Sequence, residues 1–307
     1  MRIASKSIEL VSCRGGTDMA LLTTTTQAAV TELIKPTVLL TTVGSGPFGE
    51  RSPASHIHTL TGALPPPLQF SLPAASKLSS LPLPQRKDID IGPGGLAFLV
   101  DNVMSSEQCD ALAAVSESIG YSRFAPAITT PPGMRQNSAA HWLPTDQHAD
   151  EFLDPMYHRF AHLLPPSVSG GKRYGRLSRR LAHYKYDDGD VFNMHTDGQW
   201  PGQGVQYDGE SADGTSRPVG IREWPGVVSK LSMLLYLNDA NDGVQGGATR
   251  LFHTSKDGTY TDVAPTKGSA LFFRHGFGED SVLHMGTAVS GEVPKYIVRL
   301  NVLYDDA

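Results

Sequence analysis

Two His-x-Asp pairs occur in this chain of 307 residues, His148-Ala-Asp150 and His195-Thr-Asp197. Imidazole and carboxylate groups are common metal ligands, but a pair is useful only if both side chains reach one point. The first pair lies in a segment with helical periodicity, where residues two apart do not face each other. We therefore interpret His148 and Asp150 as part of a solvated surface.

The second pair closes a strand-like run, VFNMHTD (191–197). Alternate residues of a strand point to the same face, so His195 and Asp197 can reach one ion together. Two ligands are too few, and a third must come from another segment. Two histidines and one carboxylate with open positions suit non-haem Fe(II). The downstream candidates for the third ligand are His253, His275 and His284.

Two basic residues follow on the last strand-like segment, KYIVRLNVLY (295–304). Lys295 and Arg299 fall on the same face of an extended strand. A buried cation at this place can pair with a carboxylate of a co-substrate.

The elements that must position these residues differ along the chain. LAFLVDNVM (96–104) predicts a strand, and a helix follows with Ser105 as N-cap and Gln108 completing a capping box. Apolar spacing predicts a second helix over 146–163. After residue 174, short strands separated by turn clusters predict an all-β sandwich or jelly roll with helices on one side. The strand-like segments are LAHYKY, VFNMHTD, KLSMLLYLND, ATRLFH, SALFFRHG and KYIVRLNVLY.

Residues 1–86 have a different composition, with Ser, Thr and Pro runs and few acidic residues. Such a segment is poor material for a core, and we expect a low-complexity, disordered leader. An organelle-targeting segment is the alternative, with a cytoplasmic location as the default. Residues 87–307 are then the folded domain, with a metal-binding core at about 180–306.

Charge and cysteine usage narrow the partners. The net charge of −5 gives no electrostatic reason to expect nucleic acid or an anionic membrane. No apolar run approaches the ~18 residues of a membrane span. The two cysteines, Cys13 and Cys109, make no disulfide framework.

Five motifs together resemble a known family. They occur in the order HYKYDDGDVFNMHTDG, SKLSMLLYLND, GGATRLF, GSALFF and HMGTAVSGEVPKYIVRLNVLY. Over residues 88–306 the chain resembles the Fe(II)- and 2-oxoglutarate-dependent dioxygenases, in their prolyl 4-hydroxylase-like branch. The opening segment LAFLVDNVMSSEQCDALAAV resembles the same branch.

The resemblance implies a fold, ligands and a reaction. The fold is a double-stranded β-helix, and His195, Asp197 and His284 match its metal ligands. The cofactors implied are Fe(II), 2-oxoglutarate as co-substrate, O2 and ascorbate as reductant. The co-substrate is oxidised to succinate and CO2 while the substrate is hydroxylated. The related halogenases lack the carboxylate, so Asp197 favours hydroxylation.

The co-substrate contacts are also implied by the resemblance. Lys295 matches the cation that pairs with the distal carboxylate of 2-oxoglutarate, but one residue, Pro294, looks inserted before it. That departure leaves Arg299 as the alternative. Tyr186 and Tyr236 match positions near 2-oxoglutarate, and core packing is the competing interpretation for both. Thr249 is a further pocket-lining candidate.

Substrate contacts are less specific. The glycine-rich segment 199–229 follows the metal carboxylate, and we interpret it as a lid that includes Trp200. Arg135 and Asn137 are candidates for another wall of the site. The branch indicates a prolyl residue in a peptide, and a small-molecule substrate is the alternative.

Three other interpretations keep the same fold. The site can direct a different oxidative outcome, such as demethylation or ring closure. A degenerate jelly roll can serve as a binding domain without catalysis. A zinc hydrolase can use the same three ligands, although it does not need Lys295, Arg299, Tyr186 and Tyr236 around a dicarboxylate.

Overall fold

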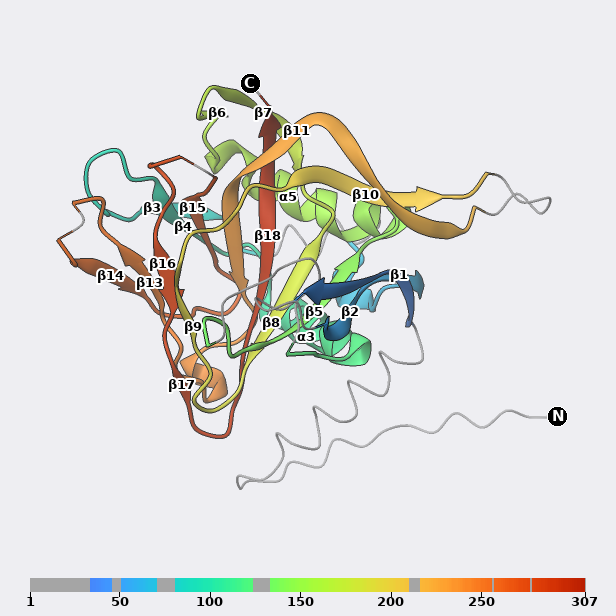
Figure 1. Cartoon of the computed structure of the whole chain (residues 1–307), viewed down its shortest axis with the longest axis horizontal. Helices are drawn as coiled ribbons and strands as arrows, with labels where there is room; N and C mark the ends of the chain where they lie inside the picture. The colour runs from blue at the N-terminus through green and yellow to red at the C-terminus, as the bar shows by residue number, and fades with distance from the viewer. Residues whose placement is uncertain are drawn as a thin grey trace.

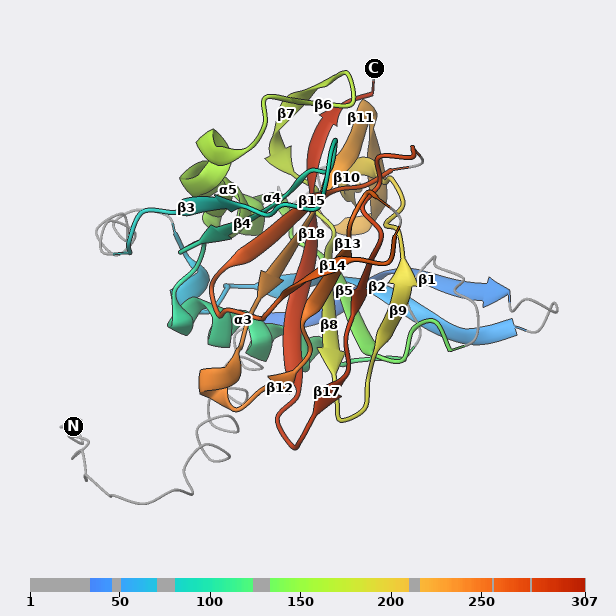
Figure 2. The same cartoon turned by 90° about the vertical axis from the view of Figure 1, so that its left-hand side faces the viewer.

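The computed structural model describes residues 34–45, 51–70, 81–123, 133–209, 216–255, 257–276 and 278–306. Their strands form a large sheet and a smaller sheet that cover a shared interior, and helices pack on the other face of the large sheet (Figures 1 and 2). This arrangement confirms the predicted mainly β, jelly-roll architecture.

The large sheet has the strand order β1-β2-β5-β8-β18-β11-β15-β4-β3. The bounds are β1 Ile34–Ser45, β2 Arg51–Gly62, β5 Ser138–Leu143, β8 Leu181–Tyr186, β18 Lys295–Asp305, β11 Pro218–Tyr236, β15 Ala270–Arg274, β4 Ala97–Asp101 and β3 Gln85–Asp88. Three more strands join it, β6 (Ser167–Val168) on β7, β7 (Gly171–Leu177) on β18 and β10 (Pro201–Tyr207) on β11.

The smaller sheet has the order β14-β13-β16-β9. Its bounds are β14 Tyr260–Val263, β13 Thr249–Phe252, β16 His284–Gly286 and β9 Phe192–His195. A further pair joins β12 (Gln245–Gly246) to β17 (Val289–Ser290). Strands β8, β18, β11 and β15 thus lie opposite the smaller sheet, as in a double-stranded β-helix.

The central strand β18 is buried on both faces, and its sequence alternates accordingly. Val298, Leu300 and Val302 belong to the core that the helices cover. Ile297 belongs to the cluster between the sheets, and Lys295 lines a pocket there. Because strand residues alternate in direction, the polar members of β18 face the interior of the jelly roll.

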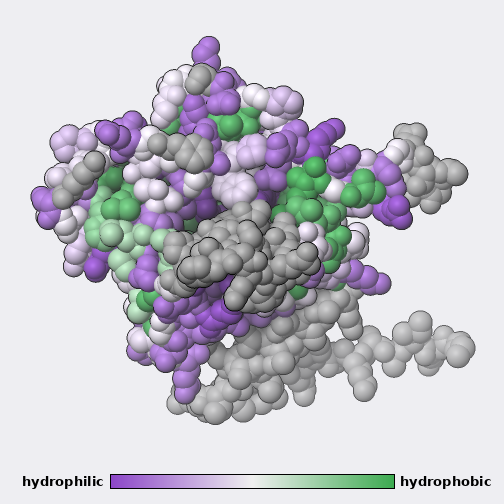
Figure 3. Space-filling view, viewed as in Figure 1, coloured by the Kyte–Doolittle hydropathy of each residue, from purple (hydrophilic) through white to green (hydrophobic). Residues whose placement is uncertain are grey.

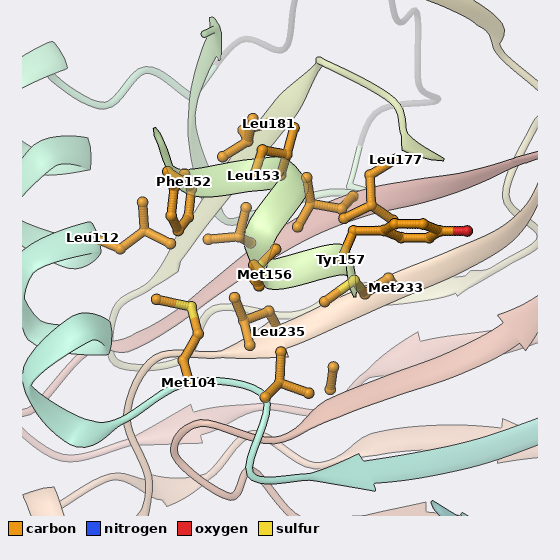
Figure 4. Close-up of a cluster of buried hydrophobic side chains, with 14 of the residues drawn as sticks. Met104, Leu112, Phe152, Leu153, Met156, Tyr157, Leu177, Leu181, Met233 and Leu235 are labelled. Atoms are coloured by element: carbon orange, nitrogen blue, oxygen red, sulfur yellow. The ribbon is translucent and has the colours of Figure 1, made fainter. Parts of the chain in front are cut away.

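Both predicted helices are present and cover the large sheet. The helix α3 (Ser106–Ile119) begins at Ser105, and Ser105 and Gln108 form the expected capping box. The second helical segment runs through α4 (Asp146–His148), η2 (Ala149–Leu153), α5 (Asp154–Phe160) and η3 (Ala161–Leu163). Figure 4 shows side chains of these helices meeting residues of the sheet, among them Leu112, Met156, Met233 and Leu235.

The widened turn η2 has a local cause. Pro155 has no backbone N–H, so it cannot donate to the carbonyl of Glu151 as a helical residue would. That carbonyl instead accepts a hydrogen bond of 2.7 Å from the backbone N–H of Phe70. The helix is thereby tied to the segment that follows β2.

The disordered leader expected for residues 1–86 is wrong for the part of it that the structure describes. Strand β2 pairs in parallel with β5, and β1 pairs with β2. Leu60, Leu68 and Phe70 are buried in the same core as the helices. The low average apolar content of this segment indicated that it could not form a core of its own. These few apolar residues instead pack against a core that the rest of the domain forms. Residues 1–33, where a targeting signal would begin, lie outside the described residues.

The segment 199–229, which we expected to form a lid, is mostly regular strand in its described part. Strand β10 pairs with the first half of β11 as a long two-stranded ribbon (Figure 1). The glycines that indicated a loop have a packing reason, because a Cβ on Gly202 or Gly204 would lie 2.9 or 3.1 Å from the ring of Trp224. Residues 210–215 lie outside the described residues.

We expected His148 to be solvated, but this prediction is wrong. The side chain is buried, and its Nε2 lies 2.7 Å from the carbonyl oxygen of Gly62. Asp150 is exposed, so the pair diverges as a helix requires. The end of β2 covers His148, and nothing in the local sequence predicts that contact. Cys109 is a buried free thiol, and Cys13 lies outside the described residues.

Among the helices of the described ranges, none combines the length and apolar character that a membrane span requires. The face seen in Figure 3 is mostly hydrophilic where it is coloured, and its hydrophobic residues gather in separate areas.

Candidate metal and co-substrate site

Two histidines face each other across neighbouring strands of the smaller sheet. His195 ends β9 and pairs with His284, the first residue of β16. Asp197 lies two residues beyond β9, and its carboxylate oxygens are each 3.8 Å from a histidine Nε2. One candidate ligand atom from each residue lies within 4.8 Å of the other two. The three side chains therefore converge on one point.

Backbone contacts orient both imidazoles. Nδ1 of His195 lies 2.7 Å from the carbonyl oxygen of Asn193, and Nδ1 of His284 lies 3.0 Å from that of Val282. A carbonyl can only accept, so Nδ1 carries the proton in both rings. Each Nε2 is left with a free lone pair beside Asp197, which is the form of histidine that binds metals.

The charge states suit a metal. Burial lowers the pKa of His195 to about 3 and lowers the pKa of His284 below its usual value. Burial alone would raise the pKa of Asp197, but Arg299 and the two histidines hold that pKa well below its usual range. At neutral pH the site therefore presents two neutral imidazoles and one carboxylate.

A chain of hydrogen bonds supports Asp197 from the large sheet. The hydroxyl of Ser232 donates to Oδ2 of Asp197 at 2.5 Å, so its oxygen accepts from Nδ1 of His275 at 2.8 Å. The hydroxyl of Ser229 then donates to Nε2 of His275 at 2.8 Å. His275 thus supports the carboxylate of Asp197 through Ser232. His253 instead contacts Thr261, at 2.9 Å.

A cavity of about 370 Å³, which we call the histidine pocket, opens beside these residues. His195, Asp197 and His284 line it together with side chains of β18. Lys295 and Arg299 are four residues apart on that strand, which separates them by about 13 Å. The lining also includes Tyr186, Leu234, Thr249 and Ile297.

Lys295 lies in this pocket as a buried cation. Its side chain is nearly inaccessible, at 1% exposure of the residue, and Nζ donates to the carbonyl oxygen of Gly247. Nζ lies 4.9 Å from the ring centre of Tyr186 and 5.8 Å from that of Tyr236. Within the described residues, no carboxylate pairs with Lys295. Burial lowers its pKa to about 7.

Arg299 has a different partner. Its Nη1 lies 3.0 Å from Oδ1 of Asp197, so this cation is already paired at the metal end of the pocket. The hydroxyl of Tyr236 donates to Oγ1 of Thr249 at 2.9 Å, which fixes Thr249 in the wall. The pocket therefore has Lys295 available at one end and Arg299 engaged at the other.

Of the three residues expected to contact the substrate, Arg135 and Asn137 contact each other, and Trp200 lies at a second cavity. Arg135 lies with its guanidinium over the rings of Tyr184 and Phe192, at 4.5 and 5.6 Å, and both rings line the histidine pocket. Asn137 is buried and accepts a hydrogen bond of 3.1 Å from Nε of Arg135. Trp200 lines a second cavity, described below.

Several site residues were missed by the sequence reasoning. Ser232 alternates with Leu234 and Tyr236 on β11, which is a signal that it faces the interior. Its contact with Asp197 depends on how β11 lies against the segment after β9, which no local pattern encodes. Likewise Asn301 continues the alternation of Lys295 and Arg299 on β18.

Comparison with known proteins adds an independent observation. The sequence profile of the 2OG-Fe(II) oxygenase superfamily matches residues 180–303. No curated protein matches the chain.

Three similar solved structures are prolyl hydroxylases. A viral collagen prolyl hydroxylase of Paramecium bursaria Chlorella virus-1 is 18% identical, with a TM-score of 0.43, and 68% of this chain and 96% of that chain are covered. A prolyl-4-hydroxylase of Pseudomonas putida is 14% identical, with a TM-score of 0.44 and 75% and 96% covered. A prolyl hydroxylase of Trichoplax adhaerens, in complex with a hypoxia inducible factor peptide fragment, is 16% identical, with a TM-score of 0.45 and 68% and 83% covered.

The profile match spans both histidines, Asp197 and Lys295, and the strands it covers form the jelly roll around them. Residues 180–303 are thus similar in sequence to the 2OG-Fe(II) oxygenase superfamily, and this is the part of the chain that contains the candidate site.

Proposed function

We propose that this protein is an Fe(II)- and 2-oxoglutarate-dependent dioxygenase that hydroxylates its substrate. The observation that carries the proposal is one pocket that contains both a His-Asp-His cluster and a buried lysine of β18, with which no carboxylate of the described residues pairs. An oxygenase of this family needs both a metal and a dicarboxylate, and each part of the pocket supplies one of the two requirements.

The donor set fits iron. Two imidazole nitrogens and one carboxylate leave open positions on a divalent ion, which is the arrangement of non-haem Fe(II) oxygenases. In our proposal His195, Asp197 and His284 are the ligands. With O2 and 2-oxoglutarate, the bound iron supplies an oxidant that replaces a substrate C–H bond by C–OH, while 2-oxoglutarate leaves as succinate and CO2. Ascorbate would serve as the reductant that keeps the iron ferrous.

The buried lysine fits the co-substrate. Burial of the Lys295 side chain makes its charged form less stable than it is in water, and this lowers the pKa of the lysine. The distal carboxylate of 2-oxoglutarate would restore a charge pair there. Arg299, in contrast, is already paired with Asp197. We therefore assign the carboxylate contact to Lys295, with Tyr186 and Thr249 beside it and Tyr236 holding Thr249.

The remaining residues prepare the site. Ser232 and His275 fix the carboxylate of Asp197, and the backbone carbonyls behind the histidines fix their tautomers. The apolar side chains of Leu234 and Ile297 line the same pocket. We infer that they exclude water from the carbon chain of 2-oxoglutarate.

A prolyl residue in a peptide is the first substrate to test, because the sequence resembles the prolyl 4-hydroxylase-like branch. A small molecule is the second candidate, and the basic pocket described in the next subsection favours it. A binding domain without catalysis predicts that iron or 2-oxoglutarate will not bind.

The first test needs no substrate. Metal-free protein receives Fe(II) and 2-oxoglutarate without oxygen, and the visible charge-transfer band of the chelated keto acid is recorded. We expect the band in the natural protein and in His253→Ala, and its loss in His195→Ala. A folded protein that binds iron but gives no band would overturn the co-substrate assignment.

A further inference from the structure

A second cavity of about 270 Å³ adjoins the histidine pocket along β18. We call it the arginine pocket and define it by His141 of β5, Arg180 before β8, Trp200 before β10, and Arg299 and Asn301 of β18. Arg299 lines both pockets, whereas Asp197 lines only the first. The guanidinium of Arg299 therefore separates the arginine pocket from Asp197, the candidate metal ligand.

Arg299 presents an unused edge. Its Nη1 pairs with Asp197, but Nε and Nη2 are buried and have no hydrogen-bond partner among the described residues. These two nitrogens form the side of the guanidinium that binds a carboxylate through two parallel hydrogen bonds. A buried donor left without an acceptor is destabilising, so an acceptor bound at these two nitrogens would be stabilising.

His141 adds a second unused donor. Nη2 of Arg180 lies 3.1 Å from Nδ1 of His141, and a guanidinium can only donate, so Nδ1 is the acceptor. Burial, with a further contribution from Arg180, lowers the pKa of His141 well below its usual value, so the ring is neutral. Its proton is then on Nε2, which is buried and has no hydrogen-bond partner in the part of the chain that the structure describes.

The charge along the inner face of β18 also favours an anion. In the described lining, the cations Lys295 and Arg299 lie against the one carboxylate of Asp197, which leaves one positive charge when Lys295 is protonated. Iron(II) would add two positive charges and 2-oxoglutarate two negative ones, so one positive charge remains for an anionic ligand. Burial lowers the pKa of Arg180 only to about 10, so this guanidinium is also charged at neutral pH.

We propose that the arginine pocket binds a carboxylate group of the substrate, through the Nε–Nη2 edge of Arg299 and Nε2 of His141. The substrate class is then a small organic acid such as an amino acid. The inference rests on the proposed hydroxylase function and extends it to substrate class.

Arg180 and Trp200 shape this site. The guanidinium of Arg180 lies over the ring of Trp200 at 4.4 Å from its centre, and it also orients His141. We infer that Arg180 is a positioning residue that keeps Nε2 of His141 as the donor. Because Trp200 lines the pocket, its fluorescence reports on occupancy.

The experiment uses the protein with Fe(II) and 2-oxoglutarate, without oxygen so that nothing turns over. The probes are the common L-amino acids, each compared with its primary amide, and proline-containing peptides with a free or an amidated C-terminus. Trp200 fluorescence and calorimetry report binding. We expect at least one free amino acid to bind, and its amide to bind about 10-fold or more weakly.

Variants separate the pocket from the rest of the site. Arg180→Met should weaken acid binding by about 10-fold while 2-oxoglutarate affinity stays unchanged, and the exposed Arg217→Met should change neither. Trp200→Phe should remove the fluorescence signal but leave the calorimetric one. The comparison of acid and amide needs no variant. It therefore tests whether the arginine pocket binds a carboxylate even if Arg180→Met does not fold.

Three results would overturn the inference: no free amino acid binds, acids and amides bind alike, or a folded Arg180→Met binds acids normally. Selective binding of peptides with a free C-terminus alone would assign the carboxylate to a chain end rather than a small molecule. A missing iron or 2-oxoglutarate signal would count against the proposed function. Acid binding, measured separately by calorimetry, would still test the arginine pocket.

Discussion

The histidine pocket and the arginine pocket share one wall, the inner face of β18, but their linings contain different charged side chains. The first combines a carboxylate, two imidazoles and a buried lysine, so it contains sites for both a cation and an anion. The second contains arginines and a histidine, and no carboxylate is part of its described lining. Lys295 and Arg299 are four residues apart on one strand, but Lys295 donates to a backbone carbonyl whereas Arg299 pairs with Asp197.

The difference lies in the chemistry of the two side chains. Burial of a lysine shifts its pKa readily, so above pH 7 Lys295 stays fully charged only when an anion binds beside it. An arginine keeps its charge and has two faces, so Arg299 can hold Asp197 with one nitrogen and offer an edge to a second ligand. The comparison yields four predictions, from the largest expected effect to the smallest.

Loss of a metal ligand should separate the pockets most strongly. We expect His284→Ala to lower iron affinity by more than about 100-fold, since removing a supporting partner already costs about 10- to 100-fold. Acid binding to the arginine pocket should persist. Iron content after dialysis measures the effect, with the half-buried His253→Ala as control. Normal iron retention in His284→Ala would refute the ligand assignment.

Removal of the buried lysine should affect only the co-substrate. Lys295→Met should lower 2-oxoglutarate affinity by about 100-fold, because truncating one partner of a buried charge pair costs about 2–5 kcal/mol. Without 2-oxoglutarate the melting temperature should rise, since an unpaired buried charge is gone. Calorimetry and thermal melting test both points, with the exposed Lys172→Met as control. If Arg299→Met lost 2-oxoglutarate binding and Lys295→Met kept it, the two assignments would exchange.

Ser232→Ala should weaken iron binding by about 10-fold, because Asp197 loses the hydroxyl that orients Oδ2. The exposed Ser290→Ala is the matched control, and competition with a chelator gives the affinity. Equal affinities in the two variants would mean that Arg299 alone orients the carboxylate.

pH should distinguish the pockets by their cations. The pKa of Lys295 is lowered to about 7 in the free protein, and a bound dicarboxylate raises it again by favouring the charged form. Above pH 7, 2-oxoglutarate binding must therefore take up a proton, and affinity should fall by up to about 10-fold per pH unit. Below pH 7 the lysine is already charged, and the affinity should level off.

Acid binding to the arginine pocket should stay constant between pH 6 and 8.5, because Arg180, with a pKa of about 10, remains charged. Calorimetric titrations at several pH values test both pockets in one protein, and Lys295→Met should remove the pH dependence of the first. A constant 2-oxoglutarate affinity in the natural protein would show that Lys295 keeps its charge without a partner.

Much of the site could be predicted from local patterns. His195 and Asp197 share a point because they are two apart in extended backbone, and Lys295 and Arg299 share a face because they are four apart on a strand. His284 could not be chosen over His253 and His275 by spacing alone, and only the resemblance to a family favoured it. The pairing of β9 with β16 places it opposite His195.

Contacts between distant segments were beyond sequence reasoning. The hairpin of β1 and β2 has a polar average composition, yet Leu60, Leu68 and Phe70 complete the core beneath the helices. The ribbon of β10 and β11 was interpreted as a lid because Gly202 and Gly204 resemble loop residues. They are instead the places where Trp224 needs room.

The sequence by itself determined which residue types were available and which of them share a strand face, because backbone geometry fixes that over a few residues. It therefore determined the His195–Asp197 pair, the Lys295–Arg299 face and the helix that begins at Ser105. Only the tertiary structure decided the partners, since strand register sets contacts between segments far apart in the chain. That register places Ser232 against Asp197, leaves Lys295 without a carboxylate partner among the described residues, and places Arg299 and His141 in one pocket.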